Sequence, residues 1–245
     1  MPPSQQLLYA LEFIPKARTC ANQDDVSNKG KAALQVAIQF YEKNATHLLQ
    51  NAIFHAEWEK AFHGHAAWPI NNTYPTTGLG SLDRLVSLKH TLDNKQQPEL
   101  ALTQSLEQDL KQLTDGRYPG NWLRHLHEAT HFLTQINMAL EQAKPICPLG
   151  RPNRKSNIMQ NVFSKYFSGE IQPWISQLHR FGQSFEPQQA SLVKGLPAME
   201  QYHHRLFKHP EGPWSSFQQS WKHHVILWQQ QLKTCQLMPK GTHAH

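Results

Sequence analysis

The chain has 245 residues, and its 24 Lys and Arg against 18 Asp and Glu give a formal net charge of +6. Seven Trp and eleven Phe exclude wholesale disorder, because unfolded polar chains carry few aromatic residues. A membrane span is excluded as well, since the longest strictly apolar runs, such as Val225–Trp228, fall far short of about 20 residues.

The chain up to residue 144 predicts a series of helices separated by turns. Between Leu34 and Phe62, apolar residues recur at spacings of three and four, which predicts one long helix. Two further helices are predicted from Ser81, a suitable N-cap, and from Pro98, which is tolerated at the first helical position. The segment Trp122–Leu140 follows and has the most regular apolar stripe in the chain.

The segment Pro145–Pro152 is rich in proline and predicts a hinge or linker. Beyond it we predict helices at about Asn157–Phe167, Pro173–Phe181, Pro197–Lys208 and Pro213–Cys235. No run of β-branched residues shows the alternation of a strand. The sequence therefore predicts an all-α fold, an irregular antiparallel multi-helix bundle that could divide into two lobes. Residues 1–144 would form a near-neutral helical scaffold, 145–156 a linker and 157–245 a basic region rich in Trp and His.

The three cysteines, Cys20, Cys147 and Cys235, are scattered and form no C-x-x-C pattern. We therefore expect neither a disulfide scaffold nor a thiolate zinc site, and this cysteine usage suits a reducing cytosol. The first basic residue, Lys16, follows the apolar stretch Leu7–Ile14, whereas a signal peptide has the reverse order. These features predict a cytoplasmic protein with no membrane partner.

The charge is distributed unevenly between the two halves of the chain. Residues 1–120 contain 11 Lys and Arg against 12 Asp and Glu, while residues 121–245 contain 13 against 6, which gives net charges of −1 and +7. No aspartate occurs after Asp115. Such an imbalance gives the second half a positive potential that attracts polyanions. We expect nucleic acid or an acidic protein as the partner, within a larger assembly.

The densest basic cluster lies in the predicted linker and the helix after it. It contains Arg151, Arg154 and Lys155, with Lys144 and Lys165 on either side. Lys and Arg are the residues that contact phosphates, so these five are the candidate nucleic-acid-binding residues. The alternative is that basic residues in an exposed loop only keep it solvated. No helix-turn-helix spacing or zinc finger supports base-specific recognition.

A candidate metal site is formed by His55, Glu59 and His63, which are spaced four residues apart. On one continuous helix from Leu34 they share a face and could hold a metal together, joined by a histidine of another helix, His90 or His125. The alternative is that the apolar face drifts at this point and leaves the three at an exposed edge. The residues that would cause this drift are Phe54, Trp58 and Phe62.

Three functions remain open from the sequence. The leading hypothesis is a non-enzymatic accessory or adaptor protein whose basic half contacts nucleic acid or an acidic partner. The second is a metal-dependent enzyme or sensor that uses the His and Glu residues above. The third is an adaptor that binds only proteins. No G-x-S-x-G elbow or other catalytic constellation appears, and the sequence leaves the cofactor unknown.

Overall fold

The computed structural model describes residues 1–63 and 77–238, and every regular element in this part of the chain is helical. The predicted all-α multi-helix fold is confirmed. No helix in the described ranges is long and apolar enough to cross a bilayer. The α-helices are α1 Pro3–Ala21, α2 Asn28–Ile53, α3 Ala56–Phe62, α4 Thr77–Asp93, α5 Leu100–Gly116, α6 Tyr118–Gln142, α7 Arg154–Val162, α8 Gln172–Val193, α9 Pro197–His203 and α10 Pro213–Thr234, with two π-helical segments, η1 Phe163–Ile171 and η2 His204–Lys208.

The chain divides into two compact units. Among the described residues, the first unit contains 1–63, 77–120 and 184–200, and the second contains 121–183 and 201–238. Residues 145–156, for which the sequence predicts a linker, lie inside the second unit. The chain thus crosses between the units at residues other than those in the proline-rich segment.

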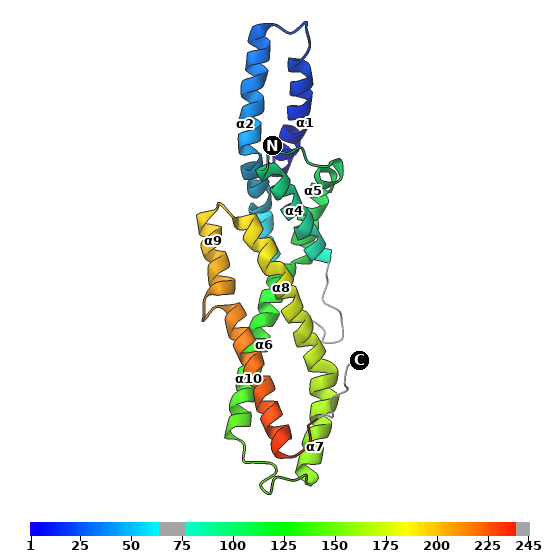
Figure 1. The fold of residues 1–245 in the computed structure, drawn as a ribbon, viewed down its shortest axis with the longest axis vertical. Helices are drawn as coiled ribbons and strands as arrows, with labels where there is room; N and C mark the ends of the chain where they lie inside the picture. Colours follow the sequence, from blue (N-terminus) through cyan, green and yellow to red (C-terminus); the bar gives the residue numbers. More distant parts are fainter. Residues whose placement is uncertain (64–76, 239–245) are drawn as a thin grey trace. The chain divides into compact units, whose positions relative to one another are not determined.

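The first unit contains an antiparallel hairpin of α1 and α2 (Figure 1). Ser27 caps α2 by accepting a hydrogen bond from the Gly30 N–H at 3.1 Å. Helices α4 and α5 pack against each other in the same unit. Their buried leucines follow the spacing predicted from the sequence and include Leu82, Leu85, Leu88, Leu106, Leu110 and Leu113.

The predicted long helix from Leu34 to Phe62 is wrong, because the chain leaves the helical path at His55. Helix α2 ends at Ile53 and α3 begins at Ala56, with His55 extended at φ −73° and ψ −167°. The break accompanies an edge-to-face aromatic pair in which the Phe54 and Trp58 ring centroids lie 4.9 Å apart. Trp58 is buried, so tertiary packing of this aromatic pair overrides the helical continuity that the spacing predicts.

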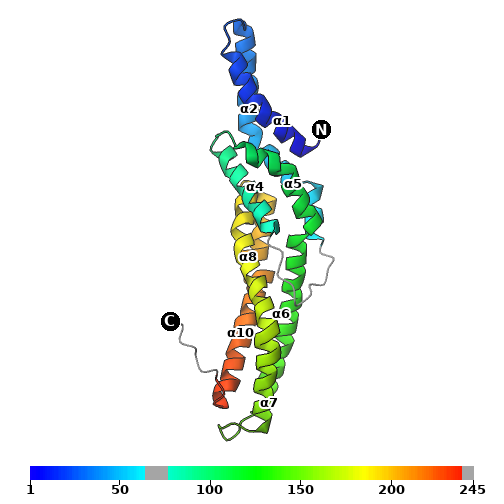
Figure 2. The ribbon, with the colours of Figure 1, turned by 90° about the vertical axis from the view of Figure 1, so that its right-hand side faces the viewer.

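In the second unit, α8 runs antiparallel to α6 and α10 (Figures 1 and 2). Trp122 lies at the centre of the core, where its ring centroid is 5.6 Å from that of Phe207 and 5.7 Å from that of Trp214. Its Nε1–H donates a hydrogen bond to the Leu178 carbonyl at 3.1 Å. This bond satisfies a polar group that burial would otherwise leave without a partner.

The helix predicted at Asn157–Phe167 and the one at Pro173–Phe181 are one continuous helical run, so the predicted break is wrong. The run passes from α7 through the π-helix η1 into α8. In a π-helix the backbone bonds are made between residues five apart, and this wider backbone ends at Ile171, two residues before Pro173. Proline has no backbone N–H to donate to the helix. At Pro173 this missing donor falls next to the change from π-helical to α-helical hydrogen bonding, so the helix continues.

Candidate polyanion interface

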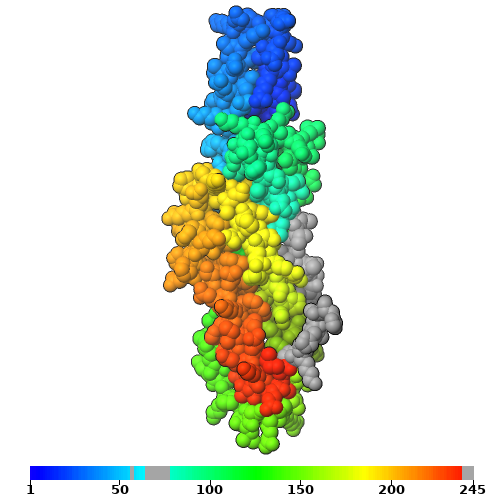
Figure 3. Space-filling view, in the orientation of Figure 1, coloured from blue at the N-terminus to red at the C-terminus, as the bar shows by residue number. Residues whose placement is uncertain are grey.

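The basic cluster lies at one end of the second unit, in residues 143–153 and the first turn of α7 (Figures 1 and 3). Asn153 caps α7 by accepting a hydrogen bond from the Ser156 N–H at 3.0 Å, and Ser156 Oγ accepts from the Asn153 N–H at 2.9 Å. The Asn153 side chain also donates to the Ile146 carbonyl at 2.7 Å. These bonds fix the loop against the helix and hold Arg151 and Arg154 at this end.

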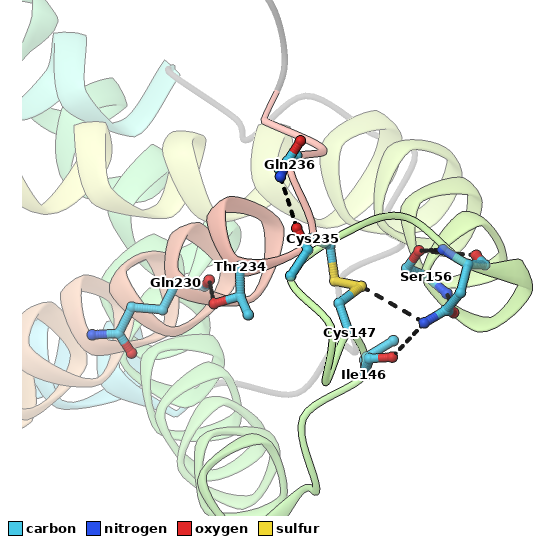
Figure 4. Close-up of a disulfide and its surroundings, with 9 residues drawn as sticks. Ile146, Cys147, Ser156, Gln230, Thr234, Cys235 and Gln236 are labelled. Carbon is cyan, nitrogen blue, oxygen red and sulfur yellow. Dashed lines mark hydrogen bonds between the residues drawn. A yellow bond between two sulfur atoms is a disulfide. The ribbon is translucent and has the colours of Figure 1, made fainter.

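A disulfide between Cys147 and Cys235 joins this loop to the end of α10 (Figure 4). The two Cα atoms lie 5.3 Å apart and both residues are buried. The Gln236 side chain adds a hydrogen bond to the Gly150 carbonyl at 2.8 Å. The argument against a disulfide is therefore wrong for Cys147 and Cys235, and Cys20 is free. Cysteine usage no longer favours a reducing cytosol, because disulfides persist in oxidising compartments.

All five basic residues of the predicted interface are exposed, namely Lys144, Arg151, Arg154, Lys155 and Lys165. Within the described part of the chain none of them forms an ion pair. The Lys165 ammonium lies over the Tyr166 ring, 5.1 Å from its centroid. Residues 142–169 contain these five basic residues and no Asp or Glu, so their charge is not neutralised locally.

The predicted metal residues are not brought together. His55 is the N-cap of the seven-residue helix α3, and His63 is its C-cap, so the helical face that they were expected to share does not exist. Glu59 is exposed between them, and the His63 carbonyl accepts a hydrogen bond from Arg117. Across residues 1–63 and 77–238, no group of three or more His, Cys, Asp or Glu is placed to hold a metal ion.

The chain was compared with known protein families, curated proteins and solved structures. A protein-family model described as "Protein of unknown function (DUF3080)" matches residues 1–239. The chain belongs to the DUF3080 family. No curated protein and no solved structure matches this DUF3080 chain.

Sequence reasoning missed an exposed apolar row beside the basic cluster of the DUF3080 chain. Ile158, Val162 and Tyr166 follow one another at spacings of four and are 55 %, 48 % and 47 % exposed. The signal was present, because apolar residues four apart share a helical face. The spacing predicts a helix at about Asn157–Phe167, but the sequence does not show which face of α7 and η1 packs inward.

Proposed function

We propose that this DUF3080 chain is a non-enzymatic accessory protein that docks on a phosphate-rich polyanion through the basic end of its second unit. The observation that carries this proposal is the exposed, unpaired set of five basic side chains in a segment of 28 residues without a carboxylate. Ordinary surfaces intersperse both signs of charge. The metal-dependent alternative has no comparable support from the described residues.

Local structure strengthens this proposal. The capping box of α7 and the disulfide hold the basic loop in a defined conformation. A pre-ordered basic surface loses less conformational entropy when it binds than a flexible tail does. Binding through phosphate contacts would be strongly salt-dependent, because each contact releases condensed counterions.

The proposal is tested with the full chain by fluorescence anisotropy on labelled DNA and RNA, and by co-sedimentation with phosphatidylglycerol vesicles. Both are run at about 50, 150 and 300 mM salt. The test variant combines Arg151→Glu, Arg154→Glu and Lys155→Glu. We expect it to bind at least about tenfold more weakly at low salt. On nucleic acid, the slope of log K against log salt concentration should become shallower by about two to three.

The matched control combines Lys29→Glu, Lys43→Glu and Lys111→Glu in the first unit. These lysines are also exposed, so the control changes the net charge by the same amount. The control should retain most of the binding. Equal loss in both variants would show that net charge alone acts, and a wild-type chain that binds none of the three polyanions would overturn the proposal.

A further inference from the structure

We propose that the polyanion is the surface of an anionic lipid bilayer, and that the apolar row Ile158, Val162 and Tyr166 enters the headgroup region. This inference rests on the proposed function and names its partner. Surface binding of this kind strengthens with the apolar area that is buried and with the attraction of basic residues to anionic lipids. Exposed apolar residues and basic residues are both present on the helical run of α7 and η1.

The apolar row and the basic residues share one side of this helical run. At about 100° per residue, Ile158 lies about 40° and Val162 about 80° from Arg154, with Lys155 at about 100°. Ser156, which is fully buried, lies about 200° from Arg154 on this projection. The buried and exposed faces of α7 are therefore opposite each other.

The π-helical turns of η1 extend this face. More than four residues make one turn of a π-helix, so Tyr166 stays in line with Val162 although it lies in the next element. Phe167 is buried on the inner side, where its ring centroid lies 4.9 Å from that of His224. An α-helical continuation would rotate Tyr166 further from the row.

The flanks of the row have the residue types that favour a bilayer interface. Lys165 covers the Tyr166 ring, and aromatic residues together with long basic side chains are enriched at the headgroup level. In the loop before α7, Leu149 is 75 % exposed and lies two residues from Arg151. Glu170 is exposed one turn beyond Tyr166, and it marks the end of the basic surface.

Lipid fits this surface better than nucleic acid does. Single-stranded nucleic acid gains its non-ionic binding energy from bases stacked on aromatic rings, but two of the three residues in the row are aliphatic. Aliphatic side chains gain from leaving water for a hydrocarbon boundary. The buried Cys147–Cys235 disulfide also favours an oxidising compartment, where membranes rather than cellular nucleic acid present phosphate.

This inference departs from the sequence-based expectation of no membrane partner. That expectation depended on the absence of a long apolar run, which a helix needs in order to span a bilayer. Docking on the surface needs only a short apolar row with basic neighbours. The row would lie at the interface, with α7 parallel to it.

The test compares the full chain on vesicles of about 30 % phosphatidylglycerol in phosphatidylcholine with vesicles of phosphatidylcholine alone, by co-sedimentation. The apolar variant combines Ile158→Asn and Val162→Asn. Its control combines Val36→Asn and Phe40→Asn, which are also four residues apart in a helix and are 68 % and 60 % exposed. Circular dichroism confirms that each variant is folded.

We expect wild type to bind the anionic vesicles and not the neutral ones. The apolar variant should bind them at least about fivefold more weakly, while its binding to RNA and the binding of the control variant stay unchanged. Undiminished vesicle binding by the apolar variant would overturn the inference and leave the proposed function standing. A wild-type chain that binds nucleic acid but not vesicles would do the same. A chain that binds neither vesicles nor nucleic acid would overturn both.

Discussion

Cys147 and Cys235 are joined by a disulfide, although 88 positions separate them in the sequence. They are 2 % and 0 % exposed, so the bond lies in the interior of the second unit. One cysteine precedes α7 and the other follows α10. The bond therefore fixes the loop that carries Arg151 to the end of another helix of the same unit.

Breaking this disulfide should destabilise the second unit. A cross-link over a long loop restricts the unfolded chain, and its loss typically costs about 2–5 kcal/mol. We expect that decrease in the free energy of unfolding for the double substitution Cys147→Ser and Cys235→Ser, measured by urea denaturation. Wild type in reductant should show a decrease of similar size.

Two controls separate the disulfide from general thiol effects. Cys20→Ser should leave the stability nearly unchanged, because Cys20 is unpaired and only partly buried. Thiol titration of the unfolded, unreduced chain should find one reactive thiol, and three after reduction. Three thiols without reductant would contradict the pairing.

Removing Arg84 and removing Asp109, which form an ion pair, should destabilise the protein by different amounts. Asp109 is 1 % exposed and accepts hydrogen bonds from Arg84 Nε at 3.0 Å on both carboxylate oxygens, whereas the Arg84 side chain is 43 % exposed. This bond raises the pKa of Arg84. Arg84→Met would strand a buried carboxylate at a cost of about 3–5 kcal/mol, while Asp109→Leu leaves an arginine that can reach water.

Urea denaturation of both single variants and of the double variant checks this asymmetry. The double variant should be more stable than Arg84→Met alone, because it leaves no unpaired buried charge. If Asp109→Leu costs as much as Arg84→Met, the asymmetry argument fails.

Substituting alanine for glycine should destabilise the fold at one helical position and not at another. A methyl group on Gly182 of α8 would lie 2.9 Å from Trp122 Cζ2 and closer still to the Trp214 ring. Gly182→Ala should therefore cost about 1–3 kcal/mol through overpacking. At Gly80 of α4 the nearest atom is Arg84 Nη1 at 3.7 Å, so Gly80→Ala should be neutral or stabilise by about 0.5–1 kcal/mol. Thermal denaturation of both variants provides the comparison.

The sequence predicted correctly the helices that are determined by the spacing of their own apolar residues. In α4, α5 and α6, buried apolar residues recur at spacings of three and four, and in α10 Trp214 and Phe217 do so as well. The break at His55 depends instead on where Trp58 packs. Local spacing carries no information about such tertiary contacts, so the predicted metal face was lost with the continuous helix.

The candidate interface was predictable only in part. Its basic residues could be found by counting charge, because an excess of charge over a long segment must be exposed somewhere. The pairing of Cys147 with Cys235 could not be found in the same way, since it depends on the fold bringing residues 88 positions apart to a Cα distance of 5.3 Å. The apolar row of α7 and η1 could not be recognised without knowing which helix face is buried.

His224 is a buried polar residue whose hydrogen bonds define its protonation state. Trp228 Nε1–H donates to His224 Nε2 at 2.9 Å, and because this indole is only a donor, Nε2 must accept. His224 Nδ1 then carries the proton and donates to Asn137 Oδ1 at 2.7 Å. Burial, with a smaller contribution from the charge of His223, lowers the pKa of His224 from 6.5 to about 4.

This lowered pKa predicts a pH dependence of stability. The unfolded chain binds a proton at His224 that the folded chain does not bind between pH 6.5 and about 4. Stability should therefore be fully present above this window, fall by up to about 1.4 kcal/mol per pH unit within it, and level off below it. Measured by urea denaturation across this range, His224→Gln should be less stable near neutral pH and should show a shallower fall.

His223, the neighbour of His224 in the sequence, provides the control for this pH dependence. His223 Nε2–H donates a hydrogen bond to a carboxylate oxygen of Glu141 at 2.7 Å, and both side chains are about half exposed. His223→Gln removes the nearby charge but leaves the Trp228 and Asn137 bonds, so it should keep most of the wild-type slope. If His223→Gln flattens the profile and His224→Gln does not, the pH response belongs to the exposed pair, and protonation of the buried imidazole does not limit stability.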